Sequence, residues 1–131
     1  MKDSFKFEIV SPEKIIFSNN ATMVTLPSYE GDMSVLKDHI SVITFLRPGK
    51  IKVEKNDQSI DEFFVEDGIV EYFKDGLVAL SVSAINVKDL SKEFLDKLSK
   101  DTQDKLMQKD ISDDERYILN HKLDTLKEIR V

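Results

Sequence analysis

The stretch LPSYEGDMSVLKDHISVITFLRPGKIKV, residues 26–53, decides the fold of this chain. It begins like a strand, breaks at Glu30-Gly31-Asp32, and resumes through apolar runs to Pro48-Gly49. Short β-rich runs separated by glycine and proline turns are typical of antiparallel sheets. The stretch also holds acidic residues and a histidine. It therefore raises three alternatives: a catalytic loop, a ligand site, or a surface that contacts another protein.

Strand patterns continue on both sides of this stretch. Phe5, Phe7 and Ile9 alternate with polar residues, and Ile51 and Val53 do the same. Such period-two alternation predicts strands with one buried face. A later run also places four apolar residues on one face, opposite two serines: Val78, Leu80, Val82 and Ala84.

Two Asp-Gly pairs, Asp67-Gly68 and Asp75-Gly76, punctuate the later strands. Asp-Gly accepts the positive φ that tight hairpin turns require, so both pairs are expected to close hairpins. Short strands with regular turn signals indicate an antiparallel β-sandwich or barrel. We assign this β domain to residues 1–87.

Residues 88–131 lack glycine and proline and predict two helices. Asp89 is the expected N-cap of the first helix, and Ser112 with Glu115 forms a capping box for the second. The apolar stripes are narrow, so the hairpin must pack against the sandwich or a partner. The first helix is expected to bury one row of residues, with Leu95 beside it: Leu90, Phe94, Leu98, Thr102 and Leu106.

Composition excludes several functions. The net charge is −6 and basic residues are interleaved with acidic ones, which argues against nucleic acid. Cysteine is absent, so thiol catalysis and disulfides are excluded, and two histidines with carboxylates argue against a zinc site. No apolar run approaches the ~18 residues of a membrane helix.

Individual polar residues do not form a recognisable catalytic or metal site. His39 follows Asp38 and such a pair performs acid–base work in enzymes, but no nucleophile motif accompanies it. A histidine bonded to backbone near a turn is the simpler interpretation. Glu30, Asp32 and Asp38 lack the oxygen set of a calcium loop. His121 is expected to be solvated on the second helix, and neither a metal nor a cofactor is predicted.

Three blocks resemble a known family in their order and spacing: IVSPEKIIFS (9–18), LPSYEGDMSVLKDH (26–39) and LRPGKIKV (46–53). The chain resembles the epsilon subunit of the bacterial-type (F-type) rotary ATP synthase, called delta in mitochondria. The resemblance implies an all-β sandwich of two five-stranded antiparallel sheets followed by a C-terminal α-helical hairpin. The chain departs from the family's usual residues at Ser34, Ser41 and Asp67, where the family has glycine, proline and glycine. These positions fall at turns and strand starts, so they affect local backbone more than function.

The resemblance also implies a role. The chain would be a non-catalytic central-stalk rotor subunit of a proton-translocating ATP synthase, on the cytoplasmic face of the bacterial inner membrane and attached to it only through the complex. Its partners would be the gamma subunit, the c-subunit ring and the catalytic alpha/beta hexamer. The c-ring contact would be the loop Tyr29, Glu30, Gly31 and Asp32.

The hairpin would restrain ATP hydrolysis by extending toward the hexamer. Its implied contacts are basic: Arg116, Lys122, Lys127 and Arg130. Some members bind ATP through a motif that opens the first helix, but this chain has Ser91, Phe94 and Leu95 in place of its Asp, Arg and Ala. Without the arginine we expect weak ATP binding or none, and no nucleotide-binding residues are assigned. The alternative is a stand-alone β-sandwich interaction module with a dimerising hairpin.

Overall fold

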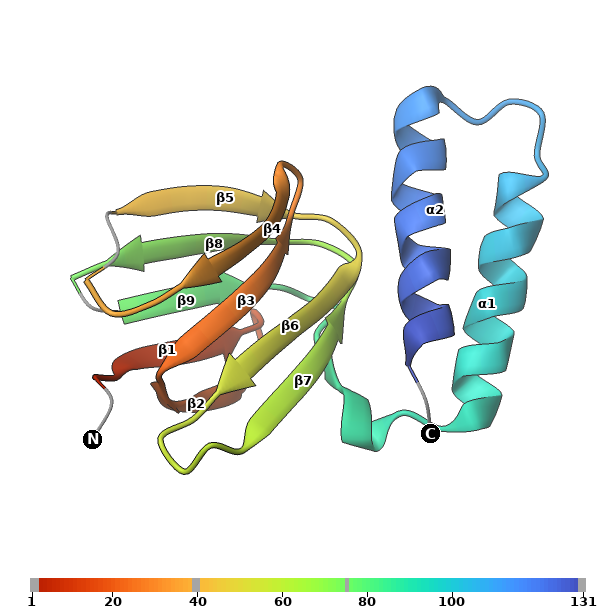
Figure 1. Ribbon diagram of the computed structural model, residues 1–131. Helices are drawn as coiled ribbons and strands as arrows, with labels where there is room; N and C mark the ends of the chain where they lie inside the picture. The colour runs from red at the N-terminus through yellow and green to blue at the C-terminus, as the bar shows by residue number, and fades with distance from the viewer. Residues whose placement is uncertain (1–2, 39–40, 75, 130–131) are drawn as a thin grey trace.

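A computed structural model describes residues 3–38, 41–74 and 76–129 (Figure 1). Ten strands precede a short 3-10 turn (Val87–Asp89) and two helices, α1 (Lys92–Leu106) and α2 (Asp113–Glu128). The strands are β1 (Phe5–Val10), β2 (Ile15–Ala21), β3 (Met23–Ser28), β4 (Gly31–Val35), β5 (Val42–Leu46), β6 (Gly49–Glu54), β7 (Ile60–Val65), β8 (Gly68–Phe73), β9 (Gly76–Leu80) and β10 (Ile85–Asn86).

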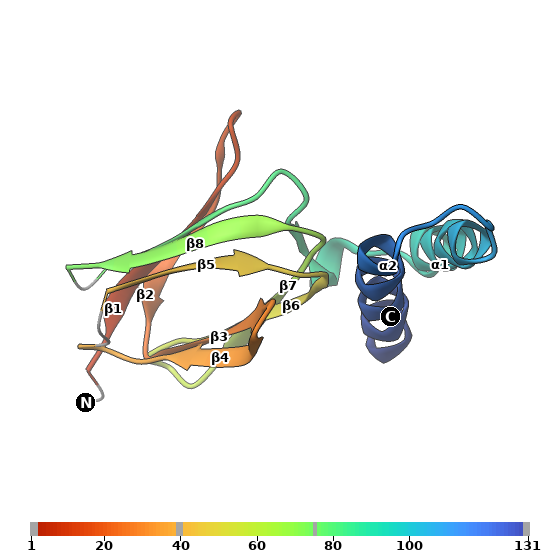
Figure 2. The ribbon, with the colours of Figure 1, turned by 90° about the horizontal axis from the view of Figure 1, so that it is seen from above.

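The strands form two packed layers, as the view in Figure 2 shows. One layer holds β10, β7, β6, β3 and β4, and the other holds β5, β8, β9, β1 and β2. This confirms the predicted sandwich followed by a helical hairpin. The two sheets are not separate, however, because the pair Ser28 and Leu46 joins β3 to β5 and makes one continuous ten-stranded order.

The expectation of purely antiparallel sheets was wrong at one pair. β1 and β9 run parallel, in register from Lys6 and Gly76 to Val10 and Leu80. Parallel strands need a long connection between them. Here nearly the whole sandwich forms that connection, so no local signal in either strand reports the pairing.

The core lies between the layers. Phe5, Phe7, Ile9, Ile51 and Val53 are each at most 2% exposed, which confirms the alternation seen in those strands. The remaining buried residues of this cluster are Ala21, Val24, Leu26, Val35, Leu46, Phe63, Val65, Val70, Tyr72, Leu77 and Ala79.

The apolar row predicted at Val78, Leu80, Val82 and Ala84 is not the core face of β9, although Ala84, beyond the strand, packs against the core. Leu77 and Ala79 are fully buried, whereas Leu80 and Val82 are 53% and 75% exposed. β9 carries apolar residues on both faces, so periodicity alone does not distinguish its core side.

Only one of the two expected Asp-Gly hairpins is a hairpin. Phe73 pairs with Gly76, so β8 and β9 are joined by a tight turn, whose Asp75 lies outside the described residues. Asp67-Gly68 instead connects β7 to β8, which pair with β6 and β5 in opposite layers. The turn at Gly68 therefore carries the chain from one layer to the other.

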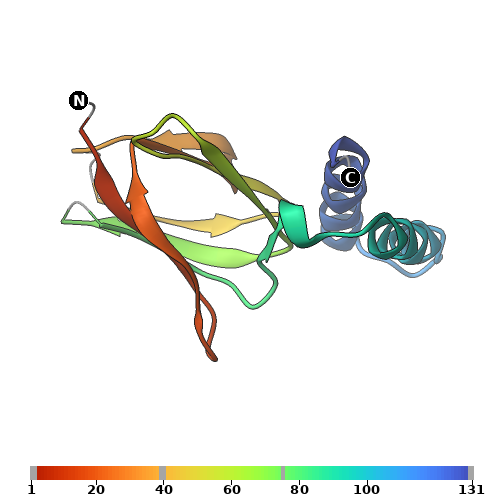
Figure 3. The same ribbon diagram turned by 90° about the horizontal axis from the view of Figure 1, so that it is seen from below.

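The hairpin stands beside one end of the sandwich rather than over either face (Figures 2 and 3). Ser91, not Asp89, caps α1, since its Oγ accepts from the Phe94 N–H at 3.1 Å. Ser112 caps α2 as predicted, accepting from the Glu115 N–H at 3.1 Å.

A small second hydrophobic cluster attaches the hairpin to the sandwich. Its buried members are Phe64 of β7, Leu90, Leu95, Leu126 and Ile129. The cluster confirms that the hairpin packs against the sandwich. The predicted stripe of α1 was wrong at one position: Phe94 is 42% exposed while neighbouring Leu95 is 6% exposed.

Candidate interaction surface

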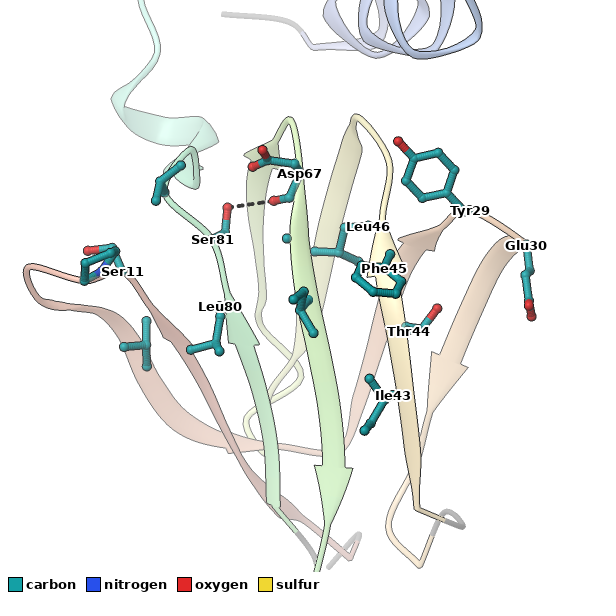
Figure 4. Close-up of a pocket in the computed structure, with 15 residues that line it drawn as sticks. Ser11, Tyr29, Glu30, Ile43, Thr44, Phe45, Leu46, Asp67, Leu80 and Ser81 are labelled. Carbon is teal, nitrogen blue, oxygen red and sulfur yellow. Dashed lines mark hydrogen bonds between the residues drawn. The ribbon is translucent and has the colours of Figure 1, made fainter. Parts of the chain in front are cut away.

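The outer surface of β5, β8 and β9 carries a row of exposed apolar side chains (Figure 4). Phe45 pairs with Ile69, and Ile69 pairs with Leu80, so the three lie side by side across the strands. They are 59%, 43% and 53% exposed. With Ile43 and Val82, which are 66% and 75% exposed, they form what we call the apolar face.

The apolar face lines a shallow groove whose border is mostly polar. Ser11 and Pro12 border it at the β1–β2 turn, and Tyr29 and Glu30 border it at the β3–β4 turn. A contiguous exposed apolar patch with a polar rim is typical of a surface that binds another protein. Sequence analysis missed this face because VITFL in β5 and GLVAL in β9 are apolar at nearly every position, so neither side of the strand stands out.

The loop predicted to contact the c-ring is a tight turn beside the apolar face. Ser28 pairs with Gly31, which leaves Tyr29 and Glu30 as the exposed connecting residues. Gly31 has φ of 121°, in the region that favours glycine. The Tyr29 N–H donates to the Phe45 carbonyl at 3.1 Å, and the Glu30 N–H donates to Ser28 Oγ at 3.1 Å. These bonds hold the turn beside the apolar face.

Asp32 belongs to the start of β4 rather than to the turn itself. Its carboxylate accepts from Arg47 Nη2 at 3.3 Å. The structure therefore brings the four predicted loop residues together at one corner of the sandwich. That corner also faces the hairpin, because Tyr29 stacks on Tyr117 of α2.

His121 of α2 is half-buried against the sandwich, whereas the prediction placed it in solvent. Arg47 Nη1 lies 3.0 Å from its Nδ1 and 2.9 Å from its Nε2, and the Tyr117 ring packs edge-on at 4.4 Å. Burial and the nearby Arg47 charge lower the pKa of His121 below its ordinary value. The sequence placed His121 on a polar helix face but contained no signal that this face meets the sandwich.

The predicted basic contacts of the hairpin are not equally accessible. Arg116 and Lys127 are exposed on α2. Lys122 is buried and forms an ion pair with Glu66, which follows β7. Arg130 lies outside the described residues. In this conformation Lys122 thus helps to hold the hairpin against the sandwich.

Among the residues that the structure describes, no group of side chains supports the other candidate sites. His39 lies outside the described residues, and the Asp38 N–H donates to the Tyr72 hydroxyl at 3.1 Å. Within the described ranges, no three His, Asp or Glu residues are grouped to hold a metal, and no helix is long and apolar enough to cross a membrane. At the degenerate nucleotide motif, Ser91 caps α1 and Leu95 packs in the second cluster.

The chain thus falls in a class of two-part proteins in which a β-sandwich with an exposed apolar face carries a laterally docked helical hairpin. Residues 4–87 match the family model of the ATP synthase delta/epsilon chain beta-sandwich domain. The chain is 41% identical over 128 residues to the ATP synthase epsilon chain of Pelagibacter ubique, covering 97% of this chain and 98% of that one. It belongs to the ATP synthase delta/epsilon chain family.

A second relative agrees with this assignment, and two solved structures share the fold. The epsilon chain of Parvibaculum lavamentivorans is 36% identical over 134 residues, covering 99% of this chain and 98% of its own length. A chain of the Euglena gracilis mitochondrial ATP synthase, in a structure of OSCP, F1 and c-ring, aligns with a TM-score of 0.79 at 18% identity, covering 95% of this chain and 80% of that one. A chain of the Tetrahymena thermophila mitochondrial ATP synthase, in a structure of the central stalk and c-ring, aligns with a TM-score of 0.61 at 12% identity. The alignment covers 97% of this chain and 96% of that one. At such identities these structures establish the fold.

Proposed function

We propose that this chain is the non-catalytic central-stalk subunit of a proton-translocating ATP synthase that links the gamma subunit to the c-subunit ring. The observation that carries the proposal is the apolar face, exposed on a chain of this family. The chain then works at the cytoplasmic face of the bacterial inner membrane and is held there only by its complex.

The apolar face supplies the contact with gamma. Phe45, Ile69 and Leu80 form its centre, and aromatic and large aliphatic anchors in the middle of an interface contribute most of the binding energy. The polar residues at its rim exclude water from that centre without adding much affinity.

The turn of Tyr29, Glu30, Gly31 and Asp32 supplies the contact with the c-ring. Glu30 is exposed and Asp32 keeps a side chain that is 73% exposed despite its bond to Arg47. One carboxylate on the turn and one at the start of β4 suit polar loops that carry positive charge, because complementary charges fix orientation and speed association.

The hairpin, residues 88–131, acts as a second domain that restrains ATP hydrolysis by the alpha/beta hexamer. The described contacts with the sandwich are few: the cluster around Phe64, the Lys122–Glu66 pair and the contacts of Tyr117 and His121. So small an attachment allows docked and extended arrangements that differ by about a few kcal/mol. When extended, Arg116, Lys122, Lys127 and Arg130 meet the hexamer.

Co-purification with tagged gamma tests the main proposal. The wild-type chain should bind gamma, and Phe45→Asp should weaken binding by at least about tenfold, because a charge replaces a central anchor. Ile60→Asp is the matched control, since Ile60 is 45% exposed in the opposite layer. Equal binding by the two variants, with equal melting temperatures, would exclude the apolar face as the gamma contact.

The ring contact is tested separately in the membrane-bound complex. Glu30→Lys should reduce retention of the c-ring, whereas Glu93→Lys, the same charge change on exposed α1, should not.

The alternative function is a stand-alone interaction module. A chain that does not bind gamma and elutes alone or as its own oligomer would support it. The buried positions of Leu95 and Leu126 weigh against dimerisation through the hairpin in this conformation.

A further inference from the structure

A polar cluster joins α2 to the sandwich at one point. Arg47, which follows β5, donates through Nη2 to Asp32 and lies against both ring nitrogens of His121 through Nη1. The Tyr117 ring covers the imidazole edge-on. The Arg47 side chain is only 17% exposed, so this contact is partly withdrawn from solvent screening.

The contact between Arg47 and His121 requires a neutral imidazole. A neutral ring has one nitrogen that accepts a hydrogen bond from the guanidinium, whereas a protonated ring has two N–H groups and no acceptor. Protonation would also set two cations about 3 Å apart, and their repulsion is strong where solvent is partly excluded. A guanidinium group does not lose its proton at physiological pH, so deprotonation on that side cannot relieve the repulsion.

We propose that Arg47 and His121 form a pH-sensitive latch, which holds the helical hairpin on the sandwich while the imidazole is neutral and releases it when the imidazole is protonated. The latch is a property of the isolated chain, so its test does not depend on the proposed role in the ATP synthase.

The charges around His121 do not cancel this effect. Asp124 on α2 and Asp32 on β4 favour the protonated ring, but burial and Arg47 outweigh them, so the pKa of His121 is lowered. Lys50 of β6 is already paired with Glu62 at 3.3 Å. The remaining charged groups that line this junction are Lys52 and Glu128.

The direction of the pH effect follows from the lowered pKa. In the undocked hairpin His121 has its ordinary pKa of about 6.5, and docking lowers it. Docking is therefore fully stabilised above about pH 6.5 and weakens as the pH falls from there toward the pKa of the docked form. One proton changes the ratio of undocked to docked hairpin by at most about tenfold per pH unit.

Distances between two fluorophores measure this ratio in the full chain. The chain has no cysteine, so Glu13→Cys on the sandwich and Lys109→Cys between the helices give unique labelling sites, both exposed. Lowering the pH from about 7.5 to about 5.5, the interval in which histidine titrates, should raise the undocked fraction severalfold. A docked fraction that does not change with pH would overturn the proposal.

Two variants assign the effect to one residue. His121→Gln keeps a neutral acceptor for Arg47 and should remove the pH dependence while the hairpin stays docked. His39→Gln changes the only other histidine of the sequence, and this variant should keep the pH dependence of docking. If His121→Gln keeps the wild-type pH dependence, the latch is excluded. Titration of the His121 ring by NMR in the wild-type chain is an independent readout. A pKa of His121 at or above about 6.5 would also overturn the latch proposal.

Discussion

Tyr29 and Tyr117 stack with their ring centroids 6.0 Å apart, although 88 residues separate them in the chain. The Tyr117 hydroxyl also donates to the Tyr29 carbonyl at 3.4 Å. Tyr29 belongs to the turn we propose for the ring contact, and Tyr117 belongs to the hairpin we propose for restraint of hydrolysis. In the docked conformation the two proposed surfaces therefore touch.

Tyr117→Ala should loosen the hairpin without unfolding the sandwich. The substitution removes the stack on Tyr29, which at this exposure contributes about 0.5–1.5 kcal/mol beyond area burial. Hydrogen exchange of α2 amides should accelerate, while amides of β6 and β7 keep their protection. Tyr117→Phe is the matched control, because it keeps both ring contacts and removes only the hydroxyl. Equal exchange in the alanine variant and the wild type would show that the stack does not hold the hairpin.

Glu66→Gln should weaken docking because it leaves the buried Lys122 ammonium without its charged partner. An unpaired buried polar group costs about 1–3 kcal/mol. Replacing both partners, Lys122→Met with Glu66→Gln, should recover most of the loss, since no unpaired charge then remains. The measurement is protease cleavage between α1 and α2. If the double variant is cleaved as readily as Glu66→Gln, removing the unpaired charge does not restore docking. The ion pair itself would then contribute the lost stability.

Deletion of residues 89–131 should raise ATP hydrolysis by the assembled enzyme severalfold, because the hairpin that restrains the hexamer is gone. The truncated chain must still co-purify with gamma through Phe45 and Leu80, which serves as the assembly control. Unchanged hydrolysis in an intact complex would exclude the hairpin as an inhibitor in this protein.

Gly49→Ala should destabilise the sandwich by about 1–3 kcal/mol through overpacking. A Cβ at Gly49 would lie 2.5 Å from Pro27 Cβ and 2.9 Å from its Cγ, and the proline ring has little freedom to move. Gly76→Ala is the control, since the nearest atom to its Cβ, the Phe73 carbonyl oxygen, would be at an ordinary 3.5 Å. Urea unfolding compares the two. A smaller loss at Gly49 than at Gly76 would contradict the tight approach of β6 to β3.

The sequence could predict only those parts of the candidate site that depend on residues close together in the chain. The turn at Glu30-Gly31 and the cap at Ser112 depend on neighbouring residues, and both form as expected. The contacts of Lys122 and His121 join α2 to groups 56 and 74 residues away, Glu66 and Arg47 (122 − 66 and 121 − 47). No spacing within α2 reveals such partners. The division of the chain at residues 87 and 88 stays a prediction.

By itself the sequence determined the elements whose signal is their own periodicity: the strands around Phe7 and Ile51, the two helices, and the ordered blocks that identify the family. Only the tertiary structure decided which side of β9 is core, that β1 runs parallel to it, and that the hairpin rests against Arg47 and Glu66. The physical reason is that alternation reports polarity along one segment. Burial and charge pairing depend instead on what the rest of the chain packs against that segment.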